Sequence, residues 1–143
     1  MSRALMEVLI CATALMAVDQ WTKRQVRLHV AGRPLACPPL GRIRLLESSK
    51  REYRDNRGRA VLVVIWMTAL VAAVALHVSG SWFQTGAGRL GLACAFGGAA
   101  GNLLDILRRR RVIDFIDLGW WPVFNIADVA IVGGLVVTFW AEI

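Results

Sequence analysis

Long apolar stretches separated by polar segments dominate the chain. A membrane-spanning helix needs about 20 predominantly apolar residues. Four stretches meet or approach that length when their flanks are included, and we predict spans at residues 4–20, 60–78, 88–105 and 124–141. The chain of 143 residues is short enough for these spans to form one transmembrane domain, residues 1–143. No small-residue cleavage site follows the first stretch, which predicts a retained helix rather than a removed signal peptide.

The third apolar stretch is unusually rich in glycine and alanine. Gly97 and Gly101 have the spacing of a small-xxx-small motif, which lets two helix backbones approach each other closely. We therefore predict that this helix packs tightly against a neighbour.

Two polar regions show strand patterns rather than helical ones. Residues 112–117 alternate between apolar and acidic side chains, which predicts a short strand. Residues 19–59 form a long polar stretch with three prolines and few helical patterns, in which residues 35–46 could form one or two short strands at the membrane surface.

Composition supports the membrane assignment. Hydrophobic residues make up 57% of the chain and charged residues 19%, with a mean hydropathy of +0.53. A soluble domain typically has about 45–50% apolar and about 25% charged residues. The net charge of +7 would suggest nucleic-acid binding in a soluble protein. In a membrane protein it indicates basic loops at anionic lipid headgroups, so we expect membrane lipids as partners and no nucleic acid.

The three cysteines have neither the spacing of a zinc site nor that of a disulfide framework. We therefore expect no metal and no cofactor.

Four aspartates lie at the edges of the last two predicted spans: Asp105, Asp114, Asp117 and Asp128. An ionisable residue within a span is costly and suggests a function. Asp128 lies one turn into the fourth span, and Asp114 would face it if the predicted strand folds back over the helix ends. Two close carboxylates share a proton, so one can act as general base and the other as acid in amide hydrolysis.

A structural interpretation competes with the catalytic one. Carboxylates at helix ends also cap backbone N–H groups or pair with basic loops. Asp105 and Asp117 fit that structural role better, whereas for Asp114 and Asp128 the pattern alone leaves both interpretations open.

Four short motifs resemble those of the signal peptidase II family, in the family's order. They resemble its D-Q-x-[ST]-K, G-N-x-x-D-R, V-V-D-F-I-D and P-x-F-N-x-A-D motifs, and here they read Asp19-Gln20-Trp21-Thr22-Lys23, Gly101-Asn102-Leu103-Leu104-Asp105, Val112-Ile113-Asp114-Phe115-Ile116-Asp117 and Pro122-Val123-Phe124-Asn125-Ile126-Ala127-Asp128.

The resemblance implies an all-α membrane protein with four transmembrane helices and a small extramembrane β-cradle. It implies an aspartic endopeptidase of the bacterial cytoplasmic membrane, with its active site on the outer side. The implied substrate is a diacylglyceryl-modified prolipoprotein, cut just before the lipidated cysteine. The family's catalytic pair matches Asp114 and Asp128, and its supporting residues match Asn102, Asn125, Asp105, Asp19 and Lys23.

The chain departs from the family pattern at three points. Ile106 replaces the arginine after Asp105, and Arg108 or Arg109 could substitute one helical turn on. The family's N-x-G-x-A-F motif is reduced to residues 56–60, with Asn56 as its remnant. Finally, 11 of the 17 Lys and Arg residues lie in the first polar loop and four in the third. Because cytoplasmic loops carry the excess of positive charge, this distribution predicts the opposite orientation to the family's.

Two other functions are compatible with these patterns. A catalytically silent relative could bind lipidated peptides without cutting them, as the altered loop motif and Ile106 would allow. A four-helix membrane subunit could use its basic loops to bind anionic lipid or a partner. Intact aspartates in all the motifs favour the enzyme.

Overall fold

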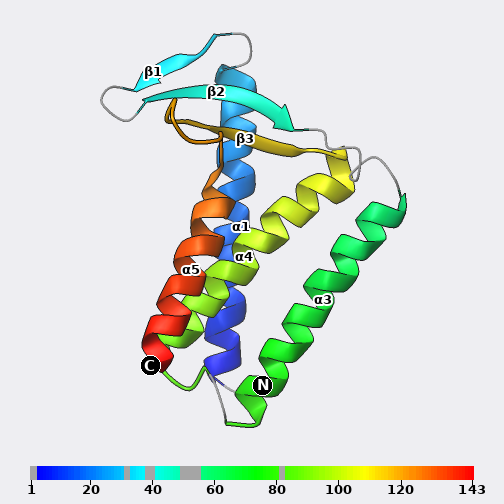
Figure 1. Ribbon diagram of the computed structural model, residues 1–143, viewed down its shortest axis with the longest axis vertical. Helices are drawn as coiled ribbons and strands as arrows, with labels where there is room; N and C mark the ends of the chain where they lie inside the picture. Colours follow the sequence, from blue (N-terminus) through cyan, green and yellow to red (C-terminus); the bar gives the residue numbers. More distant parts are fainter. Residues whose placement is uncertain (1–2, 31–32, 38–40, 49–55, 81–82) are drawn as a thin grey trace.

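A bundle of helices carries a small sheet at one end (Figure 1). The computed structural model describes residues 3–30, 33–37, 41–48, 56–80 and 83–143. Its helices and strands are α1 (Arg3–His29), β1 (Leu35–Cys37), β2 (Gly41–Ser48), α3 (Asn56–Val78), α4 (Gly86–Arg109), β3 (Val112–Asp117) and α5 (Ile126–Glu142). The predicted fold class, a helical membrane protein with a small extramembrane sheet, is confirmed.

Helices α1, α3 and α4 are long and apolar enough to cross a membrane. Helix α5 is also strongly apolar but has 17 residues. At about 1.5 Å per residue it is about 25 Å long, somewhat less than the hydrocarbon thickness of about 30 Å. Helix α1 begins and α5 ends at the end of the bundle away from the sheet (Figure 1).

Helix α1 continues well beyond its predicted span of residues 4–20. It runs to His29, so the first part of the stretch that we predicted to be an irregular polar loop is helical. The helical continuation was missed because two of its charged side chains, Asp19 and Lys23, are buried inside the bundle, although Arg24 and Arg27 are exposed. Lys23 follows Asp19 by four residues and Val26 follows Lys23 by three, so the three residues lie on one face of the helix. All three are buried.

The sheet is antiparallel, with strand order β1-β2-β3. Both strand predictions, at residues 35–46 and 112–117, are confirmed. Strand β3 lies between β2 and the segment before α5, because Phe124 forms a bridge with Ile116. Val26 and Val30 pack against Phe115 and so fix the sheet on the end of α1.

Helix α4 packs against α1 and α5 through its small residues. A Cβ atom at Gly97 would lie 2.6 Å from the backbone oxygen of Ala12 in α1. A Cβ atom at Gly101 would lie 2.6 Å from Oδ2 of Asp19. Only glycine permits these approaches, which confirms the packing role predicted for the small-xxx-small motif.

Candidate active site

Asp128 lies at the start of α5, where the chain forms a capping box. The Asn125 side chain accepts a hydrogen bond from the Asp128 backbone N–H at 3.0 Å, and Asp128 Oδ2 accepts one from the Asn125 backbone N–H at 3.0 Å. The other carboxylate oxygen, Oδ1, accepts a hydrogen bond from Asn102 Nδ2 at 2.8 Å. Asp128 therefore both caps its helix and contacts a polar side chain of α4.

Asp114 comes to the same place from strand β3. Its backbone pairs with Leu46 of β2. Its Oδ1 atom accepts a hydrogen bond from Asn125 Nδ2 at 2.8 Å. The structure thus brings Asp114 and Asp128 together on the two sides of Asn125, which is fully buried.

Asn102 links this group to α4. Its Oδ1 atom accepts hydrogen bonds from Asn125 Nδ2 at 3.1 Å and from Lys23 Nζ at 2.9 Å. Because a lysine ammonium only donates, Lys23 sets the orientation of the Asn102 amide and turns its NH₂ group toward Asp128. Two asparagines therefore hold two carboxylates that come from different elements.

A buried ionic cluster supports Asn102 from behind. Lys23 Nζ lies 2.7 Å from Asp19 Oδ2 and 2.8 Å from Asp105 Oδ2, and the side chains of all three residues are 0% exposed. Asp19 also accepts a hydrogen bond from the backbone N–H of Ala127 at 3.2 Å, which ties α1 to the start of α5. Buried charges persist where they are paired and hydrogen-bonded, as here.

Two further residues complete this cluster. Arg109 Nη1 forms an ion pair with Asp105 Oδ1, so of the two arginines suggested by the sequence it is Arg109 that contacts Asp105. Sequence reasoning did not assign a role to Gln20, whose Nε2 donates to Asp105 Oδ1 and to the Gly101 carbonyl, each at 3.1 Å. Its position between Asp19 and Lys23 in the D-Q-x-[ST]-K motif was the available signal.

Asp117 has a separate, structural environment. Its Oδ2 atom lies 3.1 Å from Arg42 Nε and 2.8 Å from Arg44 Nε, and its Oδ1 accepts from the Gly119 backbone N–H at 2.9 Å. The Gly119 hydrogen bond and the two guanidinium groups hold the pKa of Asp117 below its usual value, although burial opposes them. This matches the predicted pairing of Asp117 with a basic segment.

Asn56 is the first residue of α3 and is exposed. The residues that precede it, including Lys50, Arg51 and Arg54 of the basic loop, lie outside the described ranges. Its supporting role stays a prediction.

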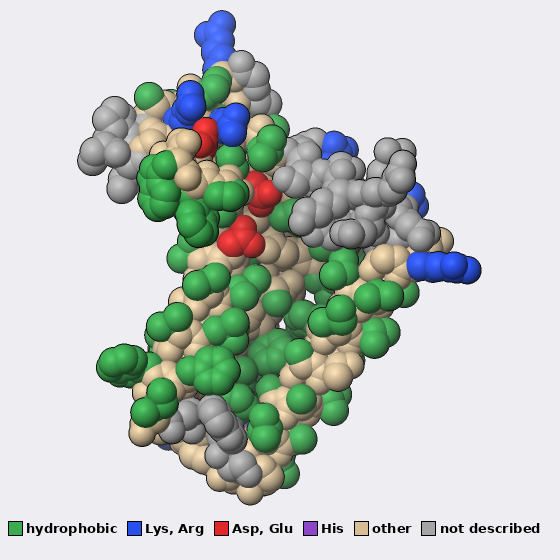
Figure 2. Space-filling view, in the orientation of Figure 1, with side chains coloured by type: hydrophobic (Ala, Val, Ile, Leu, Met, Phe, Trp, Pro, Cys, Tyr) green, Lys and Arg blue, Asp and Glu red, His purple; other side chains and the backbone are tan. Residues whose placement is uncertain are grey.

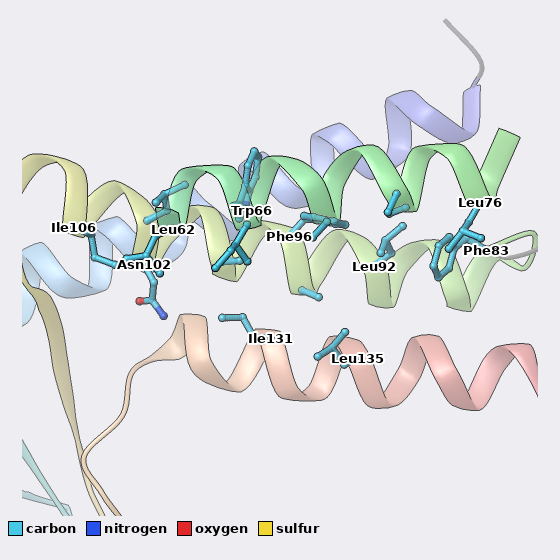
Figure 3. Close-up of a pocket in the computed structure, with 17 residues that line it drawn as sticks. Leu62, Trp66, Leu76, Phe83, Leu92, Phe96, Asn102, Ile106, Ile131 and Leu135 are labelled. Carbon is cyan, nitrogen blue, oxygen red and sulfur yellow. The ribbon is translucent and has the colours of Figure 1, made fainter. Parts of the chain in front are cut away.

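An apolar groove of about 540 Å³ leads to the polar group. It is formed by α3, α4 and α5, and Asn102 lines one end of it (Figure 3). Among the described residues, its other lining side chains are aliphatic or aromatic, including Leu62, Trp66, Phe96, Ile131 and Leu135. Figure 2 shows acidic side chains near the junction of helices and sheet, above a largely hydrophobic helical surface.

The fold and this site define a helical membrane protein in which two asparagines hold two aspartates near the end of an apolar groove. A family model described as signal peptidase (SPase) II matches residues 11–143. The chain belongs to this family, as its motifs indicated.

Similar proteins cover nearly the whole chain. A lipoprotein signal peptidase of Moorella thermoacetica is 35% identical over 144 residues, which cover 94% of this chain and 91% of the relative. One of Mycobacterium avium is 31% identical and covers 94% of this chain and 77% of the relative. A solved structure titled as a bacterial membrane enzyme has a TM-score of 0.78 at 20% identity, covering 94% of this chain and 91% of that one, which shows a common fold.

Proposed function

We propose that this protein removes the signal peptide from diacylglyceryl-modified prolipoproteins, cutting just before the lipidated cysteine. The observation that carries the proposal is the convergence of Asp114 and Asp128 on Asn125 and Asn102 at the end of an apolar groove. The names of the similar proteins, lipoprotein signal peptidases, support the substrate class.

The proposed chemistry is that of an aspartic endopeptidase. One aspartate of the pair is ionised and takes a proton from a water molecule, whose oxygen attacks the scissile carbonyl carbon. The other is protonated and donates a hydrogen bond to the carbonyl oxygen, which becomes negative in the tetrahedral intermediate. The intermediate collapses as the C–N bond breaks and the leaving nitrogen receives a proton from the pair. The two carboxyl groups titrate as a pair, so we assign neither role to one residue.

The asparagines would keep the pair ready for this reaction. Asn102 and Asn125 each donate a hydrogen bond to one aspartate. Such bonds fix the carboxylate planes and leave the remaining lone pairs directed at fixed positions. A carboxylate that rotated freely would align with water and substrate only part of the time.

The apolar groove would take an acyl chain of the substrate. The groove is lined by side chains of three helices, among them Leu62, Phe96 and Ile131. The Trp66 ring of α3 meets the Phe96 ring of α4 edge to face, with centroids 6.0 Å apart. A diacylglyceryl group lies in the bilayer beside these helices, so it can enter sideways between them. The lipidated cysteine would then lie near Asn102, next to the aspartates.

We place the protein in the bacterial cytoplasmic membrane with the sheet on its outer side. The family resemblance favours this orientation, whereas the basic first and third loops favour the reverse. A cysteine introduced at exposed Leu35, in a variant whose Cys11, Cys37 and Cys94 are replaced by alanine, distinguishes the two orientations. A membrane-impermeant thiol reagent labels it in intact cells only if the sheet is on the outer side.

The experiment that tests the function compares two substrates. The purified protein in lipid vesicles should cleave a diacylglyceryl-modified precursor and leave the same precursor without lipid largely intact. Equal cleavage of both would contradict the role of the groove. Binding of the lipidated precursor without any cleavage would instead identify a catalytically silent relative.

A further inference from the structure

The buried cluster behind Asn102 contains more negative than positive charges unless Arg109 is counted with it. Asp19 and Asp105 are both fully buried, and Lys23 is the fully buried cation between them. Two carboxylates and one ammonium leave one negative charge. A buried charge without a partner is strongly unfavourable, so a second cation beside Asp105 would stabilise the cluster.

Arg109 supplies that cation from the last turn of α4. Its Nη1 atom contacts Asp105 Oδ1 and lies 3.3 Å from Gln20 Oε1. The side chain is 26% exposed, so the guanidinium reaches into the cluster from its solvent side. Arg109 lies four residues after Asp105, on the same face of the helix.

The residue directly after Asp105 could not do the same. Ile106 lines the apolar groove, and residues adjacent in a helix do not share a face. An arginine at position 106 would therefore point toward the groove rather than toward Gln20. Arg109 therefore reaches Asp105 from a side of α4 that an arginine directly after Asp105 would not share.

We propose that Arg109 is a positioning residue for the aspartate pair, acting through Asp105, Lys23 and Asn102. The proposal rests on the proposed function. Lys23 Nζ donates a hydrogen bond to Asn102 and forms ion pairs with Asp19 and Asp105. While Arg109 balances Asp105, one donor of Lys23 remains for Asn102. Without Arg109, the unbalanced carboxylate of Asp105 draws Lys23 away, and Asn102 loses the contact that turns its amide toward Asp128.

The test uses the full chain in lipid vesicles with a diacylglyceryl-modified precursor. Cleavage by the unchanged protein and none by Asp128→Asn first establishes the proposed function; if the unchanged protein does not cleave, the function itself has failed. Arg109→Gln should then lower kcat by about 10- to 100-fold, the range known for residues that orient metal ligands from one step away, with KM nearly unchanged. Arg108→Gln is the matched control, because exposed Arg108 precedes it on the same helix end.

Two further variants separate charge balance from packing. Arg109→Lys should retain kcat within about threefold. Nη1 of Arg109 alone contacts both Gln20 and Asp105, so a lysine ammonium can take its place. The double variant Asp105→Asn with Arg109→Gln restores a neutral cluster and should cleave faster than either single variant. An unchanged kcat in Arg109→Gln, a change confined to KM, or a double variant slower than both singles would overturn the proposal. If Arg109→Gln fails to fold, Arg109→Lys and the double variant still decide.

Discussion

The two faces of helix α4 are built in opposite ways. Gly97 toward α1 and Gly98 toward α5 let backbone atoms of the neighbouring helices approach to the limit that contact allows. Toward α3, large side chains such as Leu92 and Phe96 line an apolar groove of about 540 Å³. The same helix therefore has one face without space for a methyl group and one with space for a ligand.

The glycine-rich face of α4 holds the polar contacts in place, whereas the face toward α3 leaves space for a ligand. Every described polar contact that links α1, α4 and α5 near Asn102 lies on the tightly packed side, where a small displacement would break hydrogen bonds of about 3 Å. Apart from Asn102 at its end, the described lining of the groove is apolar, so the groove can admit a flexible acyl chain. Substitutions on the first side should therefore act on stability, and substitutions on the second on substrate binding.

The largest effect is expected from Gly97→Val. The new side chain would collide with the backbone of Ala12, which cannot rotate away, and overpacking of this kind costs about 1–3 kcal/mol. The thermal unfolding temperature in detergent should fall clearly. Gly133→Val is the control, since a Cβ atom there meets nothing within 4 Å. Equal unfolding temperatures for the two variants would show that α4 is not packed as described.

A smaller effect, confined to binding, is expected from Ala69→Phe. Ala69 lines the groove on α3, and a phenyl ring there would occupy part of the proposed acyl site. KM for the lipidated precursor should rise by about tenfold, equivalent to about 1.4 kcal/mol, with the unfolding temperature nearly unchanged. Ala75→Phe, at an exposed position of the same helix outside the groove, should leave KM unaltered. An unchanged KM in Ala69→Phe would exclude the groove as the acyl site.

The smallest effect concerns the sheet, which lies outside this comparison. The pKa of Asp117 is lowered in the folded protein, so its ionised form stabilises the fold above the unfolded pKa of about 3.9, and this contribution is lost as pH falls through the folded pKa. Asp117→Asn should therefore lower the unfolding temperature by a few degrees at neutral pH. The difference from the unchanged protein should begin to shrink as pH falls below about 4 and should vanish once pH lies below the lowered pKa of Asp117. A difference that persists there would mean that charge is not its cause.

The sequence predicted the helices and strands well where one pattern dominated. Long, mostly apolar runs identified α3 and α5, and the alternation around Asp114 identified β3. The helical continuation of α1 to His29 was missed, because charged residues such as Asp19 and Lys23 look the same in the sequence whether they are buried in a helix or exposed in a loop. Only the three-dimensional contact with Asp105 shows that those charges are inside.

The candidate site was predictable in its members but not in its connections. Short motifs located Asn102 on α4, Asp114 on β3, and Asn125 and Asp128 at the start of α5. Which amide group contacts which carboxylate depends on the fold of β3 over α4 and α5, and no spacing along the chain encodes it. The groove was invisible for a similar reason, since it arises from how α3 stands relative to α4.

The central claim is that Asp114 and Asp128 together perform the cleavage. The most direct measurement is the rate of product formation from a diacylglyceryl-modified precursor by Asp114→Asn and by Asp128→Asn in vesicles, with unfolding temperatures measured in parallel because Asp128 also caps α5. Asp117→Asn provides the matched control and should still cleave. We expect no product from either variant of the pair while both remain folded. Substantial cleavage by a folded Asp114→Asn or Asp128→Asn protein would contradict the account.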